Sequence, residues 1–123
     1  LHYQFEPQAQ SKLITVIKGE IQDVAVDLRK SSPTFGKYFS IILSDSNLKQ
    51  LFIPKGFAHG FLTLSKDSIV HYKVDNFYTP HCQSSIAFND KHIGIDWNIN
   101  EKEIFTSDND RNNSSFLDIK YFN

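Results

Sequence analysis

The chain has 123 residues, of which 40% are hydrophobic, and this is enough to bury one core but not two. We therefore expect a single domain over residues 1–123. The formal net charge of -1 arises from basic residues spread among acidic ones, which argues against nucleic acid and against an anionic membrane as partners. The single cysteine, Cys82, excludes an internal disulfide and fits a reducing, cytoplasmic environment.

Short runs of β-forming residues recur between turn signals along the first three quarters of the chain. These runs cover residues 12–17, 20–27, 38–43, 50–53, 60–64, 69–74 and 85–88. Strands of this length at this spacing predict an antiparallel sandwich or barrel, and no segment before Asp90 sustains a helical period. The fold class expected from the residues is therefore all-β.

Alternation within two of the runs assigns side chains to faces. Val24 and Val26 are expected on one face of their strand, and Asp23, Ala25 and Asp27 on the other. In the run 69–74, Tyr72 shares a face with two valines and is predicted to point inward. Alternation alone favours a core aromatic at Tyr72, whose hydroxyl finds one partner.

The chain becomes polar and rich in asparagine after Asp90, mainly over residues 98–115. We expect loops and one short helix here, covering one end of the sheet structure. Residues 116–122 are apolar again and predict a terminal strand or a docking segment.

The segment IPKGFAHGF at residues 53–61 places a histidine just after a tight turn. Pro54 fixes its own φ and Gly56 permits a positive φ, so the backbone can reverse and feed the next strand. His59 is then expected at a strand mouth, where a polar group can meet a ligand. The spacing resembles the second motif of cupins, although a structural histidine after a turn remains the alternative.

The order of motifs from residue 1 to about Asp110 resembles the dTDP-4-dehydrorhamnose 3,5-epimerase family. The matching motifs are LHYQ at 1–4, SKL at 11–13, GE at 19–20, DVAVDLR at 23–29, SPTFGK at 32–37, IPKGFAHGF at 53–61, YK at 72–73, FYTP at 77–80 and GIDW at 94–97. The resemblance implies a cupin-like jelly roll, a double-stranded β-helix, usually paired as a homodimer. It implies inversion of carbon stereocentres in a dTDP-linked 4-keto-6-deoxyhexose, with no metal and no other cofactor. No His-x-His pair, which a metal cupin would need, occurs in the sequence.

The resemblance also assigns roles to individual residues. His2 matches the catalytic base, and Asp110 matches the acid that orients it, with Asp108 as the alternative. Lys12 matches the residue that faces the ketone oxygen, and Tyr72 matches the proton donor on the opposite face of the sugar.

Three further positions match substrate-binding residues of the family. His59 corresponds to a second histidine of the pocket, and Asp23 and Tyr78 correspond to positions near it.

Two departures from the family pattern bear on function. The sequence begins inside a motif that the family precedes with further residues, so the resemblance implies that an N-terminal segment is lacking. The turn at residues 81–83 replaces a more acidic segment of the family, so sugar or nucleotide contacts there are not carried over. A non-catalytic sugar-nucleotide-binding protein, or an epimerase acting only at C3 or only at C5, remains an alternative.

Overall fold

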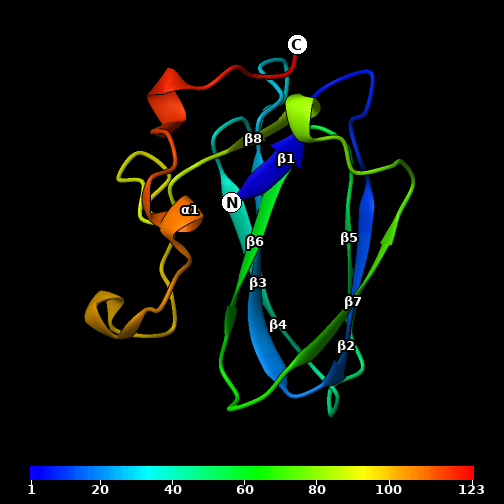
Figure 1. Cartoon of the computed structure of the whole chain (residues 1–123), viewed down its shortest axis with the longest axis vertical. Helices are drawn as coiled ribbons and strands as arrows, with labels where there is room; N and C mark the ends of the chain where they lie inside the picture. Colours follow the sequence, from blue (N-terminus) through cyan, green and yellow to red (C-terminus); the bar gives the residue numbers. More distant parts are fainter.

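Two antiparallel sheets face each other and account for most of the first 85 residues (Figure 1). The computed structural model describes residues 1–123, apart from the side chain of residue 101. One sheet, in the order β4-β3-β6-β1-β8, contains β1 (His2–Gln4), β3 (Glu20–Asp27), β4 (Tyr38–Ser44), β6 (Phe57–Thr63) and β8 (Gln83–Ser85). The other, in the order β5-β2-β7, contains β2 (Lys12–Lys18), β5 (Gln50–Ile53) and β7 (Ile69–Val74). The all-β prediction is confirmed.

The helical elements are short and lie mostly in the C-terminal third. They are η1 (Pro80–Cys82), η2 (Glu101–Glu103), α1 (Asp108–Arg111) and η3 (Phe116–Asp118). None of the helices described is both long enough and apolar enough to cross a membrane.

The predicted strand bounds are correct at β3, β5 and β7 and wrong at β6 and β8. β6 begins at Phe57, three residues earlier than predicted, because Phe57 already pairs with Asp27 of β3. β8 covers Gln83–Ser85 rather than residues 85–88, because its register is set by pairing with β1. β1 itself has only three residues, too few for a periodic signal.

Apolar side chains from both sheets fill the space between them. This inner core is formed by Ile14, Val16, Ile21, Ala25, Leu43 and Ile53. Lys12 and Tyr72 belong to the same face of the three-stranded sheet, because strand alternation from Ile14 and Val16 places them there. The inner face therefore carries apolar residues in its middle and polar ones nearer one end.

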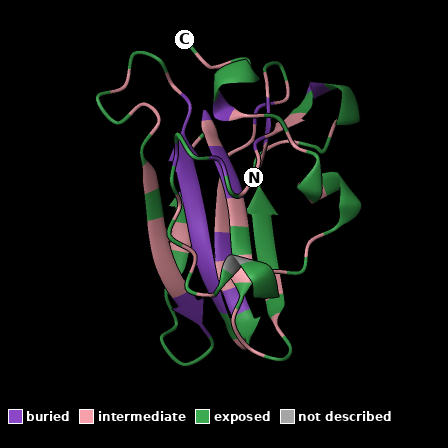
Figure 2. Ribbon diagram, turned by 90° about the vertical axis from the view of Figure 1, so that its left-hand side faces the viewer, coloured by how far each residue is buried: buried purple, intermediate pink, exposed green. Residues whose placement is uncertain are grey.

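The outer face of the five-stranded sheet is also buried, and Val24 and Val26 lie on it, on the side opposite Ala25 as their alternation predicts. β3 is buried along nearly its whole length (Figure 2). The cover is the C-terminal segment, which packs Trp97, Phe116 and Tyr121 against this core. We expected this segment to cover one end of the sheets. It instead covers a face, because the two valines leave an apolar surface that requires a partner.

Gly56 makes the turn before β6 possible. Its φ is +88°, and a Cβ at this position would lie 2.6 Å from Cγ of Arg29. His59 follows as the third residue of β6, paired with Ala25 on one side and His2 on the other. It therefore sits inside the sheet rather than at the strand mouth that the turn suggested.

Candidate active site

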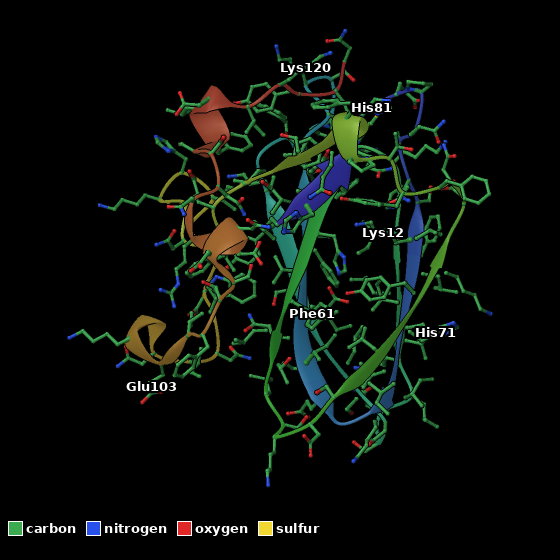
Figure 3. The ribbon with its side chains drawn as sticks, in the orientation of Figure 1. Lys12, Phe61, His71, His81, Glu103 and Lys120 are labelled. Atoms are coloured by element: carbon green, nitrogen blue, oxygen red, sulfur yellow. The ribbon has the colours of Figure 1, made fainter. Side chains whose placement is uncertain are left out.

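A cavity of about 680 Å³ is lined by residues of both sheets and of the C-terminal segment. Five of the residues predicted for the site line it: His2, Lys12, His59, Tyr72 and Asp110. Figure 3 shows Lys12 projecting from β2 into the space between the sheets. Phe61 of β6 forms an apolar wall, with its ring centroid 6.4 Å from that of Tyr72. Residues that are up to 108 positions apart thus converge on one space.

His2 and Asp110 form a pair at the rim of this cavity. His2 Nε2 lies 2.6 Å from Asp110 Oδ1, and both side chains are more than one third exposed. Ser107, the N-cap of α1, donates its hydroxyl to Asp110 Oδ2 at 3.1 Å. Burial alone would raise the pKa of Asp110, but the hydrogen bonds from His2 and Ser107 hold that pKa below its ordinary value. Asp108, the alternative acid, has no hydrogen bond to His2.

A second histidine and carboxylate pair lies deeper. His59 Nε2 and Asp23 Oδ1 are 2.6 Å apart, and both side chains are buried. Burial lowers the pKa of His59, and the hydrogen bond to Asp23 opposes this only in part.

Lys12 and Tyr72 face Asp23 from the opposite sheet. Burial lowers the pKa of Lys12, while the charge of Asp23 raises it. Burial, with a smaller contribution from Asp23, raises the pKa of Tyr72 to about 12. Tyr72 is 41% exposed and its ring lies 6.0 Å from that of His59, so it lines the cavity and is not a core aromatic. Its phenol stays protonated at neutral pH and can act as a proton donor.

Tyr78 lies elsewhere. It is 66% exposed and lines a smaller cavity of about 240 Å³ together with His2, Lys12 and Gln83, not the larger cavity that contains His59. We expected Tyr78 near His59. The two cavities share His2 and Lys12, so Tyr78 approaches these two residues from the side of the smaller cavity.

Gln83 is a site residue that the sequence did not suggest. Its Nε2 lies 3.0 Å from Nδ1 of His2. Asn113 was also missed; its Nδ2 donates to Asp110 Oδ1 at 3.3 Å. Both lie in polar segments without periodicity, and only the pairing of β1 with β8 and the position of α1 bring them to His2.

The arrangement suits proton transfer next to a carbonyl group. It offers a histidine oriented by a carboxylate, a cation that can face a developing negative charge, and a protonated phenol. Within the part of the chain that the structure describes, no cluster of three or more His, Cys, Asp or Glu side chains is placed to hold a metal ion.

The sequence profile of one protein family, described as dTDP-4-dehydrorhamnose 3,5-epimerase, matches residues 1–118. The chain belongs to this family. The epimerase from Shigella flexneri is 49% identical over 122 residues, which cover 99% of this chain and 66% of that protein. The family resemblance inferred from the motifs is confirmed.

Solved structures of the epimerase family agree with the fold. The dTDP-4-dehydrorhamnose 3,5-epimerase from Elizabethkingia anophelis superposes with a TM-score of 0.96 at 45% identity, covering 98% of this chain and 66% of that one. The dTDP-6-deoxy-D-glucose-3,5-epimerase from Legionella pneumophila, in complex with dTDP-4-keto-L-rhamnose, has a TM-score of 0.84 at 46% identity. The match covers 89% of this chain and 57% of that one. The fold is therefore the cupin-like one predicted. The chain spans slightly less than two thirds of the length of these relatives.

Proposed function

We propose that the protein catalyses the 3,5-epimerisation of dTDP-4-dehydro-6-deoxy-D-glucose to dTDP-4-dehydro-L-rhamnose, a step of dTDP-L-rhamnose biosynthesis for surface polysaccharide. The observation that carries this proposal is that the His2–Asp110 pair, Lys12 and Tyr72 line one cavity. Membership of the epimerase family supports the same reaction, and the Legionella relative contains the sugar nucleotide that this reaction would yield.

The substrate's own chemistry explains why these residue types are needed. The C4 ketone acidifies the hydrogens on C3 and C5. His2 takes a proton from one of these carbons, and the electron pair of the C–H bond moves onto the ketone oxygen. Lys12 stabilises the resulting enolate more than the ketone, because charge develops there only as the proton leaves. Tyr72 then gives a proton to the opposite face of the same carbon, which inverts it.

The remaining residues bind the substrate in this proposal. His59, held by Asp23, presents a fixed ring edge within the cavity, and Tyr78 offers an exposed aromatic face beside the smaller one. The two cavities meet at His2 and Lys12, so a ligand with a sugar in one and a further group in the other would keep its reacting carbons near both residues.

Solvent exchange tests the proposal. The protein is incubated in D₂O with a dTDP-4-keto-6-deoxyhexose, and deuterium at C3 and C5 is followed by proton NMR. We expect exchange at both carbons, and loss of exchange at both in His2→Ala, since one base serves both. Exchange at one carbon only would show that the protein is an epimerase acting at C3 alone or at C5 alone. Binding of the sugar nucleotide without any exchange would contradict the proposed enzyme activity and favour a non-catalytic binding protein.

A homodimer in the cytoplasm is part of the proposal. The edge strands β4, β5 and β7 carry large exposed apolar side chains, at Phe39, Phe52 and Ile69. Exposed apolar edges of this kind are normally covered by a partner. Light scattering at about 10 μM, where roughly 7 kcal/mol of association suffices, should give twice the chain mass. A monomer at this concentration would contradict the dimer.

A further inference from the structure

The imidazole of His2 is held at both nitrogens. Nε2 lies 2.6 Å from Asp110 Oδ1, and Nδ1 lies 3.0 Å from Nε2 of Gln83. The proposed reaction uses the first contact to orient the base, and it gives no role to the second.

Strand pairing explains why Gln83 reaches this ring. In the register of β1 with β8, His2 lies opposite Ser85, and Gln83 is two residues along β8. Residues two apart share a face of the sheet, so Gln83 projects on the same side as His2. Ser85 donates its hydroxyl to Asn113 Oδ1 at 2.7 Å, and Asn113 Nδ2 donates to Asp110 Oδ1 at 3.3 Å. β8 therefore contacts Nδ1 of His2 directly through Gln83 and is linked to Nε2 through Ser85, Asn113 and Asp110.

The donors and acceptors in this network admit one neutral tautomer. An ionised carboxylate accepts hydrogen bonds and cannot donate them, so Nε2 of His2 must carry the proton that points at Asp110. In a neutral imidazole the lone pair is then on Nδ1, and the Gln83 amide must donate to it.

We infer that Gln83 is a positioning residue that, before the substrate binds, holds His2 in the Nε2–H tautomer with the lone pair on Nδ1, the atom that takes the proton from the sugar. This inference rests on the proposed function. When the substrate binds, the amide of Gln83 leaves Nδ1, because the nitrogen has one lone pair. The substrate C–H bond then breaks, its electrons move to the ketone oxygen, and an N–H bond forms at Nδ1.

A glutamate at position 83 would change this balance without changing the shape. Its carboxylate could only accept from Nδ1–H, so it would favour the doubly protonated ring over the neutral one. The other titratable groups around His2 are Asp110 from α1, Lys12 from β2, Tyr78 from the segment before η1, His59 from β6, Tyr72 from β7 and the amino group of Leu1. These remain in place in the variant.

Long-range ¹H–¹⁵N NMR of the histidine rings tests the tautomer without substrate. For neutral His2, identified by its absence from the spectrum of His2→Ala, we expect a protonated Nε2 and an unprotonated Nδ1. Gln83→Glu should show a doubly protonated ring at a pH where the unsubstituted chain is neutral. A neutral His2 that carries its proton on Nδ1 would overturn the inference, whatever the activity of the protein.

The pH profile of deuterium exchange tests the consequence for the reaction. Gln83→Glu should move the acid limb of the profile upward by about one pH unit, with the rate above that limb retained. Gln83→Met should leave the limb in place and lower the rate several-fold at all pH values. Gln10→Glu is the matched control, because Gln10 lines the same small cavity but donates to the backbone of Asn76 at 2.8 Å.

The outcomes separate the inference from the proposed function. If Gln83→Glu and Gln10→Glu move the limb equally, the effect is one of net charge and the role given to Gln83 is wrong. If Gln83→Glu is harmless and Gln83→Met is not, the glutamine only supports the strand. If the tautomer is as expected but no exchange occurs at any pH, the proposed function fails and the assignment of Nδ1 stands.

Discussion

The carboxylate of Asp23 and the imidazole of His59 meet 2.6 Å apart inside the five-stranded sheet, with side chains 0% and 3% exposed. They come from the neighbouring strands β3 and β6. A polar pair at this depth is costly unless each partner satisfies the other, so its protonation state is coupled to folding.

The first prediction concerns stability below neutral pH. Burial lowers the pKa of His59 in the folded state, so below about pH 6.5 the unfolded chain binds more protons than the folded one. The free energy of unfolding should therefore fall as the pH drops through 6.5, by at most about 1.4 kcal/mol per pH unit from this residue. Urea unfolding at pH 7, 6 and 5.5 measures this slope.

His59→Gln is the comparison for this slope, because it removes the titrating ring and keeps a side chain that can donate to Asp23. The variant should be less stable at pH 7 and should lose less stability on acidification. Two curves that remain parallel between pH 7 and 5.5 would contradict the assignment to His59.

The second prediction concerns Asp27, which is buried on β3 but lies outside both cavities. Its carboxylate accepts from Arg29 N, Nε and Nη2 and from the hydroxyls of Ser32 and Thr34 at 2.6 and 2.7 Å. Burial alone would raise the pKa of Asp27, but these donors hold that pKa well below its usual range. Asp27→Ala should lower the free energy of unfolding by about 3 kcal/mol.

Asp45→Ala is the matched control for Asp27→Ala. Asp45 is exposed and accepts one hydrogen bond, from the backbone of Gly19 at 2.7 Å, so its loss should cost about 1 kcal/mol or less. Equal losses in the two variants would show that the network around Asp27 adds nothing to stability. The carboxylate of Asp27 stabilises the fold above about pH 4, and this stability should be lost as the pH falls further.

The contrast between β3 and β8 shows how far the sequence predicts this fold. β3 has eight residues, lies between clear turn signals and was placed correctly. β8 has three residues, and its position depends on pairing with β1, which no local pattern encodes. The order of motifs suggested His2, Lys12, Tyr72 and Asp110 as one site. Gln83 could not be found in this way, because its contact with His2 depends on the register of two very short strands.

The third prediction concerns Lys12. Lys12→Gln should lower the rate of deuterium exchange by about 10²–10³ at saturating substrate, the usual loss when one group that stabilises a developing oxyanion is removed. The KM should change much less, because the enolate charge is absent from the bound ketone. Lys18→Gln, at the exposed end of the same strand, should leave both parameters unchanged. An equal loss of exchange rate in the two variants would show that Lys12 does not stabilise the enolate.

The last prediction separates the two faces of the sugar. Tyr72 lies across the cavity from the five-stranded sheet that carries His2, and burial raises the pKa of its phenol to about 12, so it remains a proton donor over the working pH range. Tyr72→Phe removes this donor and leaves the ring. Abstraction by His2 and return of a solvent-derived proton from the same side need no acid opposite, so deuterium exchange should persist. Inversion needs the opposite proton and should fall by about 10²–10⁴. Proton NMR of one reaction in D₂O measures both rates, exchange from the loss of the C3 and C5 signals and inversion from the product's coupling pattern. If exchange and inversion fall by the same factor, Tyr72 positions the substrate and another group supplies the proton.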